Sequence, residues 1–367
     1  MQAHNPENER VKHRYFTYLR EAKRCGEASL DSVAKALNRY ERYTRFRDFR
    51  QFHTQQAVGF KRYLAEQLNT RTGDKLSKST LHSTLNALRN FFFWLAGQAG
   101  FRSRLAYSDA EYFNLSAKDT SIAKAHRDAA APTIEQVIHV LRTAPCETPL
   151  DRRNRAVIAF TLLTGIRDRA VASVKLKHVQ FDQACVVQDA REVQTKFSKT
   201  STVWFFPVGI EVATIVGDWI AYLSADQLWG LNDPLFPATQ VTLNGDGEFE
   251  ATGLDRKHWS TAAPIRKIFK AAFSKVGMPY FPPHSFRKTL ARLGEQLCRT
   301  PEEFKAWSQN LSHETVLTTF SSYGEVTATR QAELMRSLAI PVQPEATALD
   351  QIAEVLRSMG RMPQLTR

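Results

Sequence analysis

Cysteine is scarce in this 367-residue chain, and a long apolar run is missing. Four widely spaced cysteines form no CxxC pair, which argues against a zinc ribbon or a disulfide scaffold; they are Cys25, Cys146, Cys185 and Cys298. The longest apolar stretch, Ala156 to Leu163, falls well short of the roughly 20 residues that span a membrane. The polar first ten residues lack the apolar core of a signal peptide. We therefore expect a cytoplasmic protein.

Acidic residues are few in the first part of the chain. Residues 1–104 contain 20 Lys and Arg against 9 Asp and Glu, whereas the remainder contains 30 against 28. The formal charge of +13 is therefore concentrated before residue 105. A basic domain joined to a nearly neutral one suggests that the first binds a polyanion and the second acts on it, although surface cations can also serve solubility alone.

Apolar periodicity predicts a helical first domain, residues 1–115. The clearest helical face comprises Leu81, Leu85, Leu88, Phe92 and Leu95. Ser77 is its candidate N-cap and Gly97 its candidate end. The neighbouring aromatics Phe91, Phe93 and Trp94 are expected to widen this face and to lie in the core. Earlier helices are expected over residues 9–23, 30–43 and 55–67.

Arginines alternate with aromatic residues between positions 42 and 50. Such a segment can follow a phosphate backbone, or it can be a helix end with solvated arginines, and the sequence leaves both interpretations open. With two lysines near the next polar turn, the candidate phosphate contacts are Arg42, Arg45, Arg47, Arg50, Lys75 and Lys78.

The chain is long enough for a second domain, expected over residues 132–340 after a polar and alanine-rich linker, 116–131. Strands are predicted over residues 184–188, 192–197 and 202–208. Helices are predicted over residues 133–142, 154–163, 167–174, 211–223, 264–276, 285–298 and 301–310. The fold class is therefore mainly α with a small antiparallel β-sheet (α+β). Residues 341–367 are expected to form a proline-stiffened linker and an amphipathic helix that either docks on a neighbouring protomer or folds back.

Six residues of the second domain have the side chains that metal-free phosphodiester chemistry needs. In chain order they are Arg167, Lys196, His284, Arg287, His313 and Tyr323. Guanidinium groups keep their charge and bind two oxygens in a planar fork, so the two arginines suit a phosphate clamp. A tyrosine hydroxyl can attack phosphorus when a histidine accepts its proton, and a lysine can protonate the departing oxygen.

The sequence of the same domain contains no recognisable metal-binding or nucleotide-binding motif. His284 and His313 lack nearby cysteines or carboxylates at a recognisable ligand spacing, which argues against a metal hydrolase. A Walker A loop is also missing, which agrees with a reaction that does not use ATP. We expect neither a metal nor another cofactor.

The motifs that carry the six residues resemble those of the tyrosine recombinases, which include phage-type integrases. They read Thr164-Gly165-Ile166-Arg167, Thr195-Lys196-Phe197-Ser198-Lys199, His284-Ser285-Phe286-Arg287, and Leu311-Ser312-His313 followed by Tyr323. The resemblance spans about residues 8–338, and the helical first part is similar to the family's core-binding domain.

The resemblance implies a site-specific recombinase or integrase of a mobile element, which cleaves and rejoins duplex DNA through a 3′-phosphotyrosyl intermediate. Tyr323 would be the nucleophile and Lys196 the general acid. The two arginines would bind the phosphate, with His284 and His313 assisting. The partners implied are double-stranded DNA, held partly by the six cations named above, and accessory DNA-bending proteins. Four protomers would act together on two sites in the nucleoid, while a monomer is compatible with the free protein.

Four positions depart from the family pattern. Ala170 stands where an acidic residue is usual, Ser312 replaces a glycine, and Lys288 replaces a frequent histidine. Tyr323 lies ten residues after His313, where nine is usual. Lys199 is an alternative general acid, although the distance from Lys196 to the next strand matches the family's. A type IB topoisomerase-like enzyme and a cleavage-deficient DNA-binding relative remain alternative functions.

Overall fold

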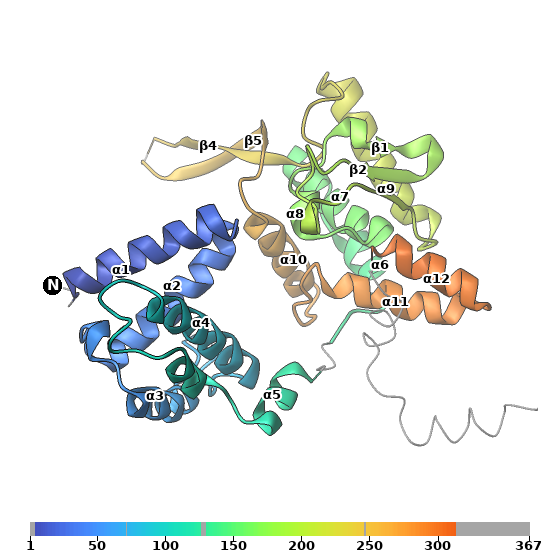
Figure 1. Ribbon diagram of the computed structural model, residues 1–367. Helices are drawn as coiled ribbons and strands as arrows, with labels where there is room; N and C mark the ends of the chain where they lie inside the picture. The colour runs from blue at the N-terminus through green and yellow to red at the C-terminus, as the bar shows by residue number, and fades with distance from the viewer. Residues whose placement is uncertain (1–3, 71, 126–129, 246, 313–367) are drawn as a thin grey trace, which may run out of the picture. The chain divides into compact units, whose positions relative to one another are not determined.

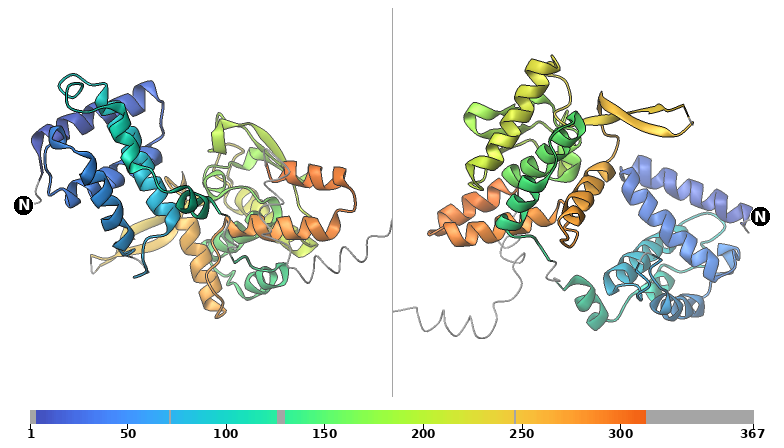
Figure 2. Two further views of the ribbon diagram at one scale, coloured as in Figure 1. Left: turned by 60° about the horizontal axis from the view of Figure 1, so that its bottom comes forward. Right: turned by 180° about the vertical axis from the view of Figure 1, so that it is seen from behind.

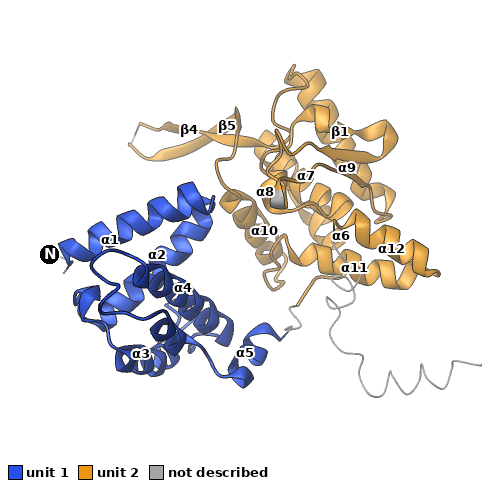
Figure 3. Ribbon diagram, viewed as in Figure 1, with its two compact units in different colours: residues 1–125 blue, residues 126–367 orange. Residues whose placement is uncertain are grey.

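The computed structural model describes residues 4–70, 72–125, 130–245 and 247–312 (Figure 1). The chain forms two compact units, Met1–Ala125 (unit 1) and His126–Arg367 (unit 2), as Figure 3 shows. The C-terminal linker and amphipathic helix predicted over residues 341–367 lie outside the described residues. Within the described ranges, every helix is too short or too polar to cross a membrane.

Unit 1 is helical, as the sequence predicts. Its helices are α1 (Pro6–Thr17), α2 (Glu27–Tyr43), α3 (Thr54–Glu66), α4 (Lys78–Ala96) and α5 (Ala117–Lys124). A π-helical turn (Tyr18–Ala22) continues α1, and 3-10 turns occur at Phe49–Gln51 and Tyr107–Phe113.

Helix α4 supplies much of the core of unit 1. The Ser77 hydroxyl accepts a hydrogen bond from the Thr80 amide at 3.2 Å, and the helix ends before Gly97, so both predicted boundaries are confirmed. Leu88 and Phe92 are fully buried, in line with the predicted apolar face. The expectation of a buried Phe93 is wrong, because its side chain is 56% exposed and its ring lies against the exposed ring of Tyr107 at 4.8 Å.

Part of the predicted linker is helical. Residues 117–124 form α5, where the Ser116 hydroxyl accepts a hydrogen bond from the Asp119 amide at 3.0 Å. Lys78 of α4 pairs with Asp119 at 2.8 Å. The cap and the ion pair together explain why this polar segment folds against unit 1.

Unit 2 combines helices with two small antiparallel sheets (Figure 2), which confirms the predicted fold class. Its helices are α6 (Ile134–Thr143), α7 (Pro149–Thr164), α8 (Asp168–Val171), α9 (Ile210–Ala221), α10 (Ala263–Lys275), α11 (Ser285–Leu297) and α12 (Pro301–Asn310). The apolar stretch of α7 is buried at the centre of the core, as its sequence predicts for a buried helix.

The first sheet has the order β1 (Val179–Gln180), β2 (Cys185–Gln188), β3 (Ser201–Trp204). The register pairs Val186 with both Val179 and Val203. The predicted strand at residues 192–197 is wrong, because β2 pairs directly with β3 and the residues between them form a loop. Val193 of this loop points into the core and is 2% exposed, which explains its apolar character without a strand.

The second sheet is a hairpin that was not predicted from the sequence, β4 (Pro237–Leu243) paired with β5 (Phe249–His258). It extends away from the helices of unit 2 (Figures 1 and 2). Arg153 of α7 holds its base, donating hydrogen bonds of 3.0 Å to the Pro237 carbonyl and to the Thr239 hydroxyl. Burial lowers the pKa of Arg153 to about 10, so this anchor remains charged at neutral pH.

Candidate functional site

The first motif is a helix-ending turn that depends on glycine. Gly165 follows α7 with a φ of 60°, a left-handed conformation that favours glycine at a helix end. A Cβ at Gly165 would lie 2.8 Å from Leu290 Cδ1 and 3.2 Å from Leu311 Cδ2. The turn is therefore packed against the segments that carry the His284 and Leu311 motifs, and it places Arg167 at the N-cap of α8.

Arg287 joins three of the four motifs. It lies in the first turn of α11, is 6% exposed, and donates a hydrogen bond from Nη1 to the Gly165 carbonyl at 2.6 Å. Its Nη2 donates to the Leu311 carbonyl. Burial, together with the charge of Arg167, lowers the pKa of Arg287 to about 9, which leaves the guanidinium charged at neutral pH. Two main-chain carbonyls thus fix a buried cation in place.

His284, Arg167 and Lys196 belong to the same electrostatic cluster as Arg287. Partial burial lowers the pKa of His284, and the positive charges of Arg287, Arg167 and Lys196 lower it further, against the opposing effect of Asp168. The imidazole is therefore neutral at pH 7 and can accept a proton or a hydrogen bond. Burial also lowers the pKa of Arg167, which is half-buried. The structure thus brings together four of the six predicted catalytic residues, and His313 and Tyr323 lie outside the described residues.

The lysine candidates lie on the loop between β2 and β3. Lys196 begins a 3-10 turn, Lys196–Ser198, and Lys199 follows it; both lysines are exposed. The Ala190 amide donates a hydrogen bond to the Thr200 hydroxyl at 3.1 Å, which closes the base of the loop. Of the two lysines, Lys196 is the one whose charge contributes to the lowered pKa of His284.

The segment before His313 is held from two sides. Asn310, the last residue of α12, accepts a hydrogen bond from the Trp204 amide at 2.7 Å and donates one to the Trp204 carbonyl at 2.9 Å. Trp307 donates to the Leu290 carbonyl at 2.9 Å and packs on Gly294, where a Cβ would lie 2.5 Å from its Nε1. Leu311 is buried, and Ser312 adopts a left-handed φ of 53°. This left-handed backbone explains why the family pattern has a glycine at position 312.

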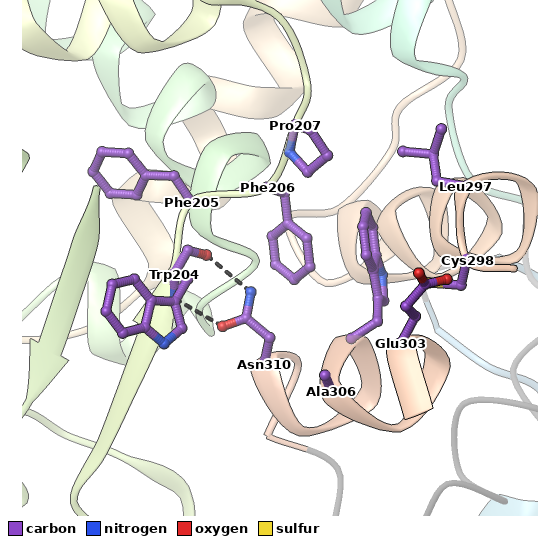
Figure 4. A pocket seen from close by; sticks show the side chains of 10 residues that line it. Trp204, Phe205, Phe206, Pro207, Leu297, Cys298, Glu303, Ala306 and Asn310 are labelled. Atoms are coloured by element: carbon purple, nitrogen blue, oxygen red, sulfur yellow. Dashed lines mark hydrogen bonds between the residues drawn. The ribbon is translucent and has the colours of Figure 1, made fainter. Parts of the chain in front are cut away.

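An apolar pocket lies beside this segment (Figure 4). Its walls come from the residues around β3 and from α11 and α12, including Trp204, Phe206, Pro207, Leu297 and Trp307. The four clustered candidates Arg167, Lys196, His284 and Arg287 do not line it. The pocket is therefore separate from the polar cluster.

A charged contact next to Arg167 was not predicted from the sequence. Asp168 forms an ion pair with Arg266 of α10 at 2.7 Å. The pair ties the start of α8 to α10. The sequence signal was only an acidic residue at the first position of a short helix, which is common for dipole reasons and does not identify a distant partner.

The six predicted DNA contacts are spread over unit 1 and have different surroundings. Arg50 pairs with Glu7 at 3.0 Å, Lys75 with Glu66 at 2.6 Å and Lys78 with Asp119 at 2.8 Å. Arg45 and Arg47 are in the turn that follows α2, where the nearby Phe49 is buried. The arginines of this segment are therefore exposed while Phe49 lies in the core, so the alternation of residue types follows an alternation of surface and core positions.

Arg42 has a different environment. It lines a polar hollow between α2, α3 and the start of α4, together with Arg39, Gln67, Asn69 and Thr80. Arg39 donates a hydrogen bond to the Thr84 hydroxyl at 3.0 Å. Arg39 was not singled out from the sequence, although it lies three residues before Arg42 and so shares its face of the helix.

In the described part of the chain, no group of three or more His, Cys, Asp or Glu side chains is arranged to hold a metal ion.

Comparisons with known proteins place this geometry in a family. The Phage integrase family matches residues 131–330, more than half of the chain. No curated protein matches the sequence. Among solved structures, a lambda integrase dimer bound to a core site matches with a TM-score of 0.59 and 12% identity, over 87% of this chain and 97% of that one.

Two further solved structures have the same fold. The XerH recombinase in a post-cleavage complex matches with a TM-score of 0.58 and 14% identity, over 89% of this chain and 83% of that one. The Tn1549 transposon integrase bound to circular intermediate DNA matches with a TM-score of 0.55 and 15% identity, over 90% of this chain and 99% of that one. The chain therefore belongs to the phage integrase family, has the tyrosine recombinase fold, and is a DNA strand-exchange enzyme.

Proposed function

We propose that the protein is a site-specific recombinase that cleaves and rejoins duplex DNA through a 3′-phosphotyrosyl intermediate, without metal or ATP. The observation that supports it most is the position of Arg287, whose bonds to Gly165 and Leu311 join three of the four motif segments. The charges of Arg287, Arg167 and Lys196 also act together on His284 and contribute to its lowered pKa.

The reaction would proceed by transfer of the phosphate between two oxygens. The Tyr323 oxygen attacks the scissile phosphorus, the bond from phosphorus to the 5′ oxygen breaks, and that oxygen takes a proton from Lys196. Arg167 and Arg287 stabilise the charge on the non-bridging oxygens. The neutral imidazole of His284 supplies a hydrogen bond or accepts the tyrosine proton, and His313 assists it. Because the phosphotyrosyl bond conserves the energy of the phosphodiester, rejoining needs no nucleotide.

The assembly we propose is a tetramer of this chain on two DNA sites, formed from monomers and helped by DNA-bending proteins. Unit 1, with its excess of basic residues, would hold the DNA, including contacts by some of the six predicted cations. The gene would belong to a mobile element, and the protein would act on DNA in the cytoplasm. Deletion of residues 346–367 tests whether the C-terminal helix joins protomers: loss of synapsis with retained cleavage of single sites supports this role, and unchanged synapsis contradicts it.

Trapping of the covalent intermediate tests the central proposal. Full-length protein is incubated with a nicked suicide duplex that carries the junction sequences bordering its element, and the adduct is mapped by mass spectrometry. An adduct on Tyr323 that is lost in Tyr323→Phe and retained in Tyr280→Phe supports the proposal. Binding of the same DNA without any adduct would favour the cleavage-deficient alternative. Relaxation of supercoiled DNA of any sequence would favour the topoisomerase-like one.

A further inference from the structure

Glu192 lies on the loop between β2 and β3, four residues before Lys196, and its carboxylate faces a group of basic side chains. Oε2 lies 2.9 Å from Nε2 of His178, and Oε1 lies 2.9 Å from Nζ of Lys177. Nζ of Lys175 lies 3.6 Å from Oε1. The hydrogen bonds from Lys177 and His178 lower the pKa of Glu192 to about 2, so the carboxylate is charged at any pH at which the protein works.

His178 is a fixed partner for this carboxylate. Its side chain is 5% exposed, and its Nδ1 accepts a hydrogen bond from the Lys175 amide at 3.0 Å. Because Nδ1 is an acceptor, the proton of the neutral ring is on Nε2 and is donated to Glu192. The contact therefore ties the loop to a buried group of the core and not to a mobile surface side chain.

The loop is fastened again directly after Glu192. Val193 is buried in the core, and the Gln194 amide donates a hydrogen bond to the Ser173 hydroxyl at 2.9 Å. The Ser173 hydroxyl in turn donates to the carbonyls of Arg169 and Ala170, at 3.1 and 3.2 Å. This part of the loop is thus connected, through Ser173, to α8, the helix whose N-cap is Arg167.

These contacts end two residues before Lys196, which is exposed. We infer that Glu192 is a positioning residue for Lys196: its ion pair with Lys177 and the hydrogen bond that it accepts from His178 hold the lysine arm in reach of the departing 5′ oxygen. The inference rests on the proposed role of Lys196 as general acid. Position 170, where the family pattern has a carboxylate, is a buried alanine, whereas the carboxylate that contacts His178 and Lys177 belongs to the loop itself.

The size of the effect follows from what a general acid contributes. Proton transfer by a positioned side chain accounts for roughly 10²–10⁴-fold in rate. A displacement of about 1 Å is enough to lose about 10²-fold. We expect Glu192→Ala to slow cleavage about 10- to 100-fold, less than Lys196→Ala, with unchanged affinity for DNA.

A substrate with sulfur in place of the bridging 5′ oxygen separates positioning of the acid from a general structural defect. A thiol has a pKa of about 8.5, far below that of an alcohol, so the sulfur departs as a thiolate with the bonding electron pair and needs no proton. Loss of the general acid therefore slows the oxygen substrate and spares the sulfur substrate. A defect in the phosphate clamp or in the fold slows both.

The experiment measures single-turnover cleavage of the two suicide duplexes by the full-length wild type, Glu192→Ala, Glu192→Gln and Lys196→Ala. We expect Lys196→Ala and Glu192→Ala to be slow on the oxygen substrate and within about threefold of wild type on the sulfur substrate. Glu192→Gln keeps a hydrogen-bond acceptor for His178 and should be intermediate, which gives a second variant if the alanine variant unfolds. Asp189→Asn is the matched control, since Asp189 pairs with Arg191 within the same loop at 2.6 Å.

The outcomes separate the proposed role of Lys196 as general acid from the inferred role of Glu192 in positioning it. Rescue of Lys196→Ala by sulfur without rescue of the Glu192 variants removes the positioning role and leaves the general acid in place. Wild-type rates of the Glu192 variants on oxygen also remove the positioning role. Failure of sulfur to rescue Lys196→Ala removes the proposed role of Lys196, and with it the inference about Glu192.

Discussion

Arg287 and Gly165 are 122 positions apart in the chain, and the Nη1 group of Arg287 donates a 2.6 Å hydrogen bond to the Gly165 carbonyl. The glycine turns this carbonyl toward the arginine because it adopts a φ of 60°. A buried cation without such acceptors would be costly. The bond therefore serves the fold and the site at once: it compensates the buried charge, and it sets the distance between the two arginine-bearing segments.

Replacement of Gly165 should lower the free energy of unfolding by more than the strain of its backbone conformation alone. A left-handed φ costs an alanine about 1–2 kcal/mol, and the overlap with Leu290 and Leu311 adds about 1–3 kcal/mol. We expect Gly165→Ala to lower the free energy of unfolding by about 2–5 kcal/mol in urea titrations. Gly277→Ala is the control, because Gly277 has a φ of 70° and no atom within 4 Å of the place where its methyl group would lie. Equal losses for the two variants would contradict the packing argument.

Arg287→Lys should keep the charge and lose the function. One ammonium group cannot bond the carbonyls of Gly165 and Leu311 and also present a planar fork to a phosphate. Loss of a transition-state donor of this kind costs about 10²–10³-fold, so single-turnover cleavage of the suicide duplex should fall by that factor. Affinity for the duplex, measured by fluorescence anisotropy, should change little. Cleavage close to the wild-type rate would show that the fork geometry is not needed.

Ser312→Gly should stabilise the protein. Ser312 has a φ of 53°, a conformation that glycine adopts without a Cβ penalty. After allowance for the greater freedom of glycine in the unfolded chain, we expect a gain of about 0.5–1 kcal/mol in the free energy of unfolding. Ser312→Ala keeps the Cβ and should give no gain. A gain in the alanine variant would assign the effect to the hydroxyl instead.

Three histidines should make the fold sensitive to mild acid. Burial lowers the pKa values of His178, His258 and His284 below their ordinary 6.5. Below pH 6.5 the unfolded chain binds protons that the folded chain does not, so the free energy of unfolding falls as the pH drops below that value, until the lowered pKa values are reached. Well above pH 6.5 these groups contribute no slope. Glu192, with a pKa of about 2, adds almost none near neutral pH.

Urea unfolding between about pH 5 and 8 measures this slope. Each histidine contributes at most about 1.4 kcal/mol per pH unit. His258→Gln removes one such group away from the candidate catalytic residues, and its slope below pH 6.5 should be shallower than that of wild type. An unchanged slope would mean that His258 titrates normally in the folded protein.

Arg42→Ala should weaken DNA binding in a way that depends on salt and not on sequence. Arg42 lines the polar hollow with Arg39, where a phosphate would meet two guanidinium groups. Loss of one phosphate contact reduces the slope of log K against log salt by about one. Arg24→Ala is the control, because the Arg24 side chain is 80% exposed and pairs with Glu21, three residues earlier in the chain. Equal effects of the two variants would show that the hollow is not a phosphate-binding site for DNA.

Local signals predicted the ends of several helices well. Ser77 and Gly97 mark the two ends of α4, and α12 covers the predicted residues 301–310, because a cap and its helix are close in the chain. The β4–β5 hairpin was missed although its turn contains glycine and asparagine. Apolar and polar residues alternate only weakly along its strands. Its base is held by a hydrogen bond from Arg153, which belongs to a helix distant in the chain.

The sequence by itself determined the family, the mainly helical fold class and the order of the candidate motifs, because these depend on residue type and short spacing. Only the tertiary structure decided how the motifs meet. Arg287 reaches Gly165, Glu192 reaches His178, and the predicted strand at residues 192–197 becomes a loop anchored by Val193. Each of these contacts joins residues from different elements, and their formation depends on the packing of a common core, which no local pattern encodes.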